Sequence, residues 1–175
     1  EVYVNEHIPL KSPIPYPHVR EADVMWSKIV WRIVDLRQKQ NLPLYYPTNP
    51  IGKRRNLTDL LLWGIENEGI TPYATDDWLN EFKVPMTKEQ IDFKFDALAK
   101  TEQVLDVNTG MMVEQQVAGE RHTDEIKQLL IKEKWYFDKQ HSTLQVRIVG
   151  ICPLRIYNRK DETGMPTEEI LKSPV

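Results

Sequence analysis

Few residues of this sequence have the types and spacing that catalysis or metal binding would need. The histidines are spread over a predicted arm, loops and a turn, so that a zinc site would need several coincidences of folding. They are His7, His18, His122 and His141. The single cysteine, Cys152, precedes a proline inside an apolar stretch, which favours a buried, inert thiol over a nucleophile.

Other signatures of chemistry are also missing. The sequence has no phosphate-binding glycine loop, no paired-histidine zinc helix and no nucleophile elbow. The neighbouring carboxylates Asp76 and Asp77, or Glu66 and Glu68, could serve as acid and base, but solvated side chains are the simpler interpretation. We therefore predict no catalytic residue, no metal and no cofactor.

Aromatic and basic residues offer a different chemistry, namely contact with a partner. Trp26 and Trp31 are five residues apart in a predicted helix, about 140° around its axis, so one flat face cannot bury both. Burial on two sides of a core is the alternative. The predicted loop that follows carries two tyrosines and a basic run that could meet an acidic surface or simply be solvated. The candidate partner-binding residues are Trp26, Trp31, Tyr45, Tyr46, Lys53, Arg54 and Arg55.

The elements that must position these residues follow from periodicity and capping. Polar residues recur every three or four positions from 21 to 39, which predicts a helix with a wide apolar arc. Asn56 as N-cap and Gly69 at the C-terminal end bound a second helix, and Thr87 with Gln90 forms a capping box that starts a short third.

The second half of the chain favours strands. Strands at 101–107 and 111–117 flank a glycine-containing turn, and strands at 126–137 and 144–151 form a second hairpin whose last strand is central in its sheet. Residues 124–133 could also be read as helix, but the aromatic triplet at 135–137 favours strand. Residues 158–175 are polar and predict a loose tail.

Length and charge limit the class of protein. With 175 residues, a net charge of −3 and apolar runs far shorter than a bilayer requires, the chain fits one domain without a membrane span, and nucleic acid is not expected as a partner. We predict an α+β fold, with two main helices and a short third packed on an antiparallel sheet. Residues 1–20 form a proline-rich extended arm, 21–157 a single domain and 158–175 a polar tail.

Three segments carry a specific resemblance. Residues 22–28 (ADVMWSK), continuing through 30–32 and 35–37 to 43–47 (PLYYP), resemble the opening signature of the GldN/PorN family. Residues 134–140 (KWYFDKQ) with 146–151 (VRIVGI) and Pro153 resemble its central strand pair, and the turn at 85–87 (PMT) also fits. Strings with several tryptophans in register are more specific than any short motif.

The resemblance implies a non-enzymatic structural subunit of the type IX secretion and gliding-motility machinery of Bacteroidetes. It implies a periplasmic location at the inner face of the outer membrane, self-association in a ring with a GldK/PorK-like lipoprotein, and contact with a GldM/PorM-like motor component. The chain begins at Glu1 without an apolar leader, so we expect a removed signal peptide or tag, and we expect a family segment beyond Val175. The alternative function is an extracytoplasmic ligand-binding module that uses exposed aromatics.

Overall fold

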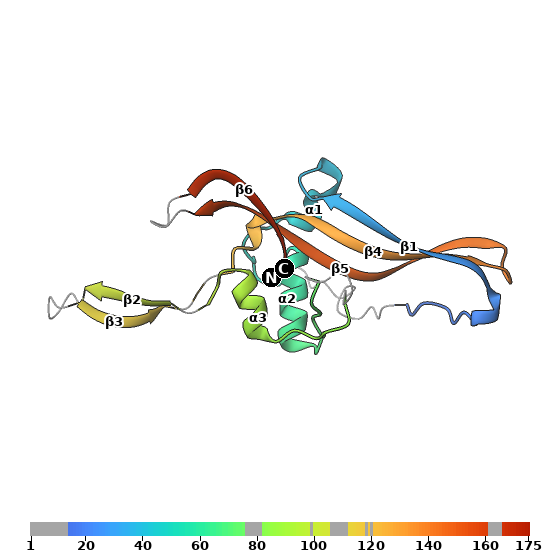
Figure 1. The fold of residues 1–175 in the computed structure, drawn as a ribbon, viewed down its shortest axis with the longest axis horizontal. Helices are drawn as coiled ribbons and strands as arrows, with labels where there is room; N and C mark the ends of the chain where they lie inside the picture. Colours follow the sequence, from blue (N-terminus) through green and yellow to red (C-terminus); the bar gives the residue numbers. More distant parts are fainter. Residues whose placement is uncertain are drawn as a thin grey trace, which may run out of the picture.

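A four-stranded antiparallel sheet is the main element of the fold (Figure 1). The computed structural model describes residues 14–75, 82–98, 100–105, 112–117, 119, 121–160 and 166–175. The strand order is β1-β4-β5-β6, and all neighbours are antiparallel. Its strands are β1 (Val24–Asp35), β4 (Ile126–Asp138), β5 (Thr143–Lys160) and β6 (Pro166–Pro174). A separate hairpin pairs β2 (Lys100–Leu105) with β3 (Met112–Val117).

Within the described ranges, three α-helices lie outside the sheet, and side-chain caps begin two of them. They are α1 (Leu42–Tyr45), α2 (Leu57–Asn67) and α3 (Lys88–Lys94). The Asn56 side chain accepts the Asp59 amide at 2.7 Å at the start of α2, and Gly69 takes the left-handed φ of +71° after its end. Thr87 and Gln90 form both hydrogen bonds of a capping box on α3. The predicted second and third helices are therefore confirmed.

The helix predicted for residues 21–39 is wrong. After one 3₁₀ turn, η1 (Glu21–Asp23), residues 24–35 form β1, which pairs with β4 along this length, and residues 36–38 form a turn. The helix was predicted partly from the four-residue spacing of Lys28 and Arg32. This spacing does not distinguish the two structures, because residues four apart share a face in a helix and also in a strand. The segment's many β-branched residues favour the strand once β4 is available as a neighbour.

The hairpin predictions are confirmed, and the loose tail is not. β2 with β3 and β4 with β5 form the two hairpins, and β5 lies between β4 and β6 as expected. The turn at 108–110 lies outside the described residues. Residues 124–133 begin with the 3₁₀ turn η3 (Thr123–Glu125) and continue as β4, not as helix. The expected tail instead adds β6 to the sheet, pairing Ile170 to Pro174 with Asn158 to Leu154.

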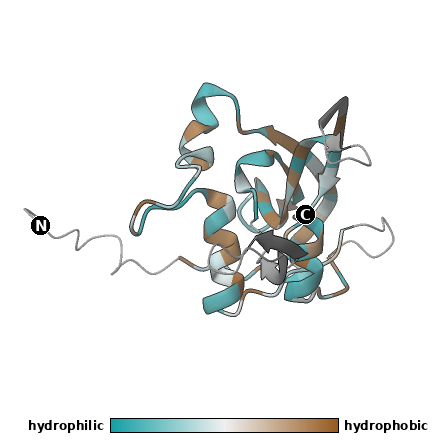
Figure 2. Ribbon diagram, turned by 90° about the vertical axis from the view of Figure 1, so that its left-hand side faces the viewer, coloured by the Kyte–Doolittle hydropathy of each residue, from teal (hydrophilic) through white to brown (hydrophobic). Residues whose placement is uncertain are grey.

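The core lies where α2 and α3 meet one end of the sheet. Its buried residues come from directly after β1, from α3 and the residues that follow it, and from the start of β4. They are Leu36, Ile91, Phe95, Ala97, Ile126 and Leu129. In the view of Figure 2, polar and apolar residues alternate along the helices that cover this end. The far end of the sheet has no such cover from α2 or α3 (Figure 1), and it is there that the described part of the N-terminal arm, residues 14–20, runs beside the β4–β5 hairpin.

Candidate partner-binding surfaces

The register of the sheet sorts its side chains onto two faces. Pairing of Val30 with Glu133, and of Glu133 with Ile148, places these three residues on one face, which we call the glutamate face. Pairing of Trp31 with Lys132, and of Lys132 with Gly150, defines the opposite face, which we call the tryptophan face. Side chains alternate along each strand between its register shifts, and the shift at Val149 of β5 is the reason that Ile148 and Gly150 lie on opposite faces.

The glutamate face exposes a group of apolar side chains at the end of the sheet away from the core. Its half-exposed members come from β1 and β5: Trp26, Leu144, Val146 and Ile148. Trp135 and Phe137 of β4 lie between these two strands and are only partly covered. An apolar surface on a sheet of this kind is typical of a contact with another protein.

An ion pair borders this apolar group on the side nearer the core. Glu133 Oε2 accepts hydrogen bonds from Arg32 Nη2 at 3.1 Å and from the Trp135 indole Nε1 at 2.8 Å. The Glu133 side chain is 7% exposed, whereas that of Arg32 is 52% exposed. A nearly buried carboxylate therefore depends on a cation that still reaches the surface.

The tryptophan face carries a compact aromatic contact. The rings of Trp31 and Phe82 stack with centroids 6.1 Å apart, and Lys132 Nζ lies 5.1 Å from the Trp31 centroid. Phe82 also lies directly over Gly150, where an added Cβ would come within 2.7 Å of its ring. The absence of a side chain at Gly150 thus makes room for Phe82 against the sheet.

The two predicted tryptophans lie on opposite faces of β1. Trp26 is 49% exposed on the glutamate face, and Trp31 is 37% exposed beneath Phe82. Their separation onto two surfaces was expected from a helix, but it arises from the odd spacing of five along a strand. Trp26 is therefore available to a partner, while much of the Trp31 ring is occupied within the chain.

Tyr45 and Tyr46 are adjacent but differ in role. Tyr45 is half-buried against the core and donates its hydroxyl to the Asp124 carbonyl at 2.8 Å, and burial raises its pKa. Tyr46 is exposed and meets Tyr45 edge-on, with centroids 5.0 Å apart. Of the two, Tyr46 has the ring surface that a partner could contact.

The basic run is divided by a turn. Ile51 and Arg54 exchange backbone hydrogen bonds of 3.0 Å, and Gly52 supplies the positive φ of +60° between them. Lys53 and Arg54 are exposed on this turn, whereas Arg55 is half-buried with its guanidinium 5.8 Å from the Trp63 ring centroid. The structure therefore presents two cations outward and packs the third onto α2.

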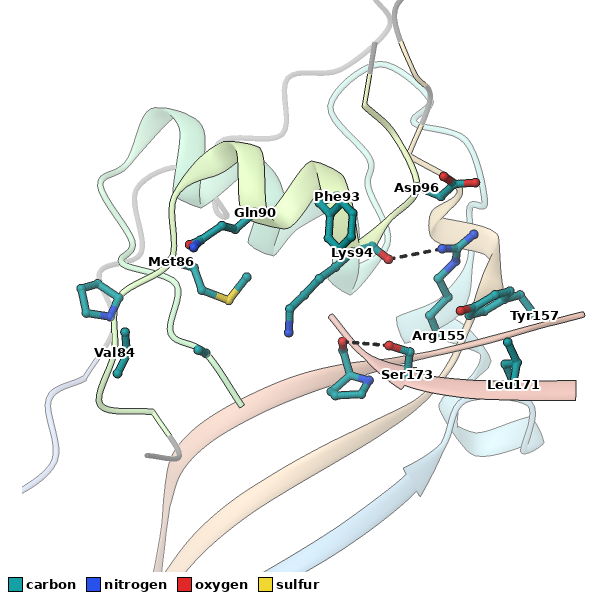
Figure 3. Close-up of a pocket in the computed structure, with 13 residues that line it drawn as sticks. Val84, Met86, Gln90, Phe93, Lys94, Asp96, Arg155, Tyr157, Leu171 and Ser173 are labelled. Carbon is teal, nitrogen blue, oxygen red and sulfur yellow. Dashed lines mark hydrogen bonds between the residues drawn. The ribbon is translucent and has the colours of Figure 1, made fainter. Parts of the chain in front are cut away.

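A cavity lies between α3 and β6. Figure 3 shows Arg155, Tyr157 and Lys94 at this cavity of about 730 Å³. The Arg155 guanidinium lies 4.1 Å from the Tyr157 ring centroid, donates to the Lys94 carbonyl at 3.2 Å and pairs with Glu125. The described residues that line this cavity show no arrangement of nucleophile, base and acid.

The described part of the chain also contains no group of three or more histidine, cysteine, aspartate or glutamate side chains placed to hold a metal ion. Cys152 is buried, with its sulfur 3.6 Å from the Thr75 hydroxyl. None of the described helices is long and apolar enough to cross a membrane.

The sequence did not point to Glu133, Phe82 or Gly150 as residues of these surfaces. Each makes a contact with a residue far away in the chain: Glu133 with Arg32, and Phe82 with Trp31 and Gly150.

The described residues thus form an α+β fold with one end of its sheet left uncovered by α2 and α3 and with aromatic and basic side chains exposed. A family profile described as "Gliding motility associated protein GldN" matches residues 19–172. The chain belongs to the GldN family of gliding motility associated proteins. No curated protein matches it.

Proposed function

We propose that this chain is a non-enzymatic structural subunit of the type IX secretion and gliding-motility machinery. In this proposal it acts in the periplasm at the inner face of the outer membrane. It forms a ring with a GldK/PorK-like lipoprotein and contacts a GldM/PorM-like motor component. Membership of the GldN family supports the proposal, as does the apolar glutamate face at the end of the sheet that α2 and α3 leave uncovered.

The candidate contact residues divide into an apolar and a basic group. Trp26 and its neighbours on the glutamate face offer an apolar surface of the kind that subunit contacts use. Lys53 and Arg54 offer cations on a fixed turn for an acidic surface of the lipoprotein or of a ring neighbour. Tyr46 adds an exposed ring, and Trp31, Tyr45 and Arg55 support these surfaces from within the chain.

The alternative, a ligand-binding module, requires its aromatic residues on one platform. Trp26 and Trp31 lie on opposite faces of β1. Trp135 and Phe137 share the face of Trp26 but are only partly exposed, so these residues do not form an exposed row. We therefore favour the subunit.

Co-expression with the lipoprotein tests the proposal. A tagged lipoprotein should retain the chain through purification, and a Trp26→Ala variant should be retained less while keeping its thermal stability. Failure of the unmodified chain to co-purify with the lipoprotein, with both proteins folded, would contradict the proposal.

A further inference from the structure

The outer edge of β5 is paired along only part of its length. β6 pairs with β5 from Leu154 onward, and from Thr143 to Pro153 the described residues give β5 a strand neighbour only on the β4 side. The Val175 amide donates to the Pro153 carbonyl at 3.1 Å, so this carbonyl points outward. Alternation along the strand then directs the amide and carbonyl of Ile151 to the same side. This edge has the backbone groups that a further strand would need.

A mostly apolar groove lies along the same stretch of β5. It has a volume of about 400 Å³, and its walls are residues 148–153 of β5 and the segment 70–75. Side chains of α2 and α3, including Leu61, Ile65 and Phe95, complete it. At its open end, Ile148 and Val149 are about half exposed. An open edge beside apolar pockets is the arrangement by which sheets bind extended peptides.

The N-terminal arm has the sequence pattern of such a peptide. All four of its prolines occupy odd positions, so in an extended strand the missing amides all face one side and the even-numbered amides are complete on the other. Most even-numbered residues are also apolar, and most odd-numbered ones are polar or proline. The even positions are Val2, Val4, Glu6, Ile8, Leu10, Ser12, Ile14 and Tyr16.

The described end of the arm indicates where the rest can go. Arg147 donates to the Pro17 carbonyl, and its guanidinium lies 5.0 Å from the Tyr16 ring centroid, which fixes the arm to its own sheet at this point. Two residues before Tyr16, the Ile14 side chain is 95% exposed, so it has little contact with the described part of its own chain. Pro13 and Pro15 stiffen the backbone on both sides of Ile14.

We propose that residues 2–10 of one copy add as a strand to the β5 edge of a second copy, with their even-numbered side chains in the groove at 148–153. Each copy then gives its arm to one neighbour and receives an arm from another, which is the head-to-tail contact that closes rings. This inference rests on the proposed function only in that the chain associates with copies of itself.

Proline substitutions at two neighbouring positions test which amides of the arm face the acceptor strand. Glu6→Pro removes an amide that should face the acceptor, and His7→Pro removes one that should face away, without loss of an apolar side chain in either case. Light scattering of the full chain over a concentration series should show association weakened about tenfold by Glu6→Pro and little changed by His7→Pro. Equal effects of the two substitutions would overturn the strand proposal.

Disulfide trapping tests the site and the donor chain. In a Cys152→Ala background, one chain carries Ile8→Cys and a second chain carries Val149→Cys, and the two are mixed under mild oxidation. We expect a covalent heterodimer on a non-reducing gel. A control acceptor, Ile29→Cys on the outer edge strand β1, should give little product.

Two results would overturn the proposal. Preferential trapping at position 29 would place the arm at another edge. An internal disulfide in the chain carrying both Ile8→Cys and Val149→Cys, with no product from the mixed chains, would mean that the arm occupies its own groove. Binding to the lipoprotein is measured separately, so loss of that binding with intact trapping contradicts the proposed function and not the arm exchange.

Discussion

Arg32 and Glu133, which are 101 residues apart in the chain, form an ion pair of 3.1 Å between β1 and the central strand β4. The carboxylate is nearly buried and also accepts the Trp135 indole, so the pair ties the edge strand to the middle of the glutamate face. A carboxylate in this position stabilises the fold only while its donors remain.

Removing the cation should leave the carboxylate undersatisfied. We expect Arg32→Met to lower the free energy of unfolding by about 1–3 kcal/mol, measured by urea denaturation. Lys28→Met, on the same face of the same strand, should change it by less than about 0.5 kcal/mol. Equal effects of the two substitutions would show that the Arg32–Glu133 pair does not stabilise the fold.

Gly150 should tolerate a side chain only when Phe82 is removed. Because an added Cβ would lie 2.7 Å from the Phe82 ring, Gly150→Ala should cost about 1–3 kcal/mol in the free energy of unfolding. In a Phe82→Ala background the same change should be neutral or slightly stabilising, since alanine loses less backbone entropy than glycine. A double-mutant cycle measures this coupling, and additive effects would argue against the contact.

Arg121 should make stability depend on pH through Glu66. It donates to Glu66 at 2.9 Å and to Asp92 at 2.6 Å, linking α2 to α3, and the hydrogen bond from Arg121 lowers the pKa of Glu66 below its ordinary value of 4.5. We expect Arg121→Met to lower the free energy of unfolding by about 1 kcal/mol at pH 7. This is less than for a fully buried ion pair, because Glu66 is partly exposed.

The direction of this pH dependence follows from the linkage between proton binding and folding. A carboxylate with a lowered folded-state pKa stabilises the protein above its unfolded pKa, and this contribution is lost as the pH falls through the folded value. The difference between wild type and Arg121→Met should therefore shrink below about pH 4.5. Lys88→Met, which removes a more exposed cation 3.3 Å from Glu66, should have a smaller effect at every pH. A difference that grows in acid would contradict this assignment.

These features show which parts of the structure the sequence could predict. The capping hydrogen bonds at Thr87 and Asn56 are local, since each joins residues three apart, and both helices were predicted from them. The β4–β5 hairpin is also close in sequence, and its aromatic and β-branched residues favour strand. Local chemistry of this kind can be read from a single chain.

Features that depend on distant neighbours could not be predicted in the same way. Lys28 and Arg32 share a face in a helix and in a strand, and only β4, about a hundred residues later, decides between the two. The contact of Phe82 with Gly150 and the pairing of β6 with β5 are likewise products of tertiary packing. Of the candidate site, the residue types were predictable, but the faces on which they lie were not.

The basic run should contribute to association through two of its three members. We expect Lys53→Glu with Arg54→Glu to slow binding of the lipoprotein at low salt and to approach wild type near 1 M salt, because exposed pairs are screened. The fold should be unchanged. Arg55→Glu serves as the contrast, since it removes a packed cation from Trp63 and should lower stability instead. The measurement is the association rate with the lipoprotein at two salt concentrations. Identical low-salt rates for wild type and the double variant would show that Lys53 and Arg54 do not contribute to this binding.

The two tryptophans should separate stability from assembly. Trp31→Ala removes the stack on Phe82 and should cost about 1–3 kcal/mol in the free energy of unfolding. Trp26→Ala should cost less than about 1 kcal/mol because half of that side chain is already exposed. If Trp26→Ala unfolds the domain as readily as Trp31→Ala does, Trp26 belongs to the folded core and not to a contact surface.

The central claim is that this chain assembles with the lipoprotein, and the most direct measurement is purification of the co-expressed pair followed by light scattering and electron microscopy. We predict a stable complex containing several copies of both proteins and closed rings in the images. A chain that elutes as a folded monomer beside the folded lipoprotein, with no shared peak and no rings at any concentration, would contradict the claim.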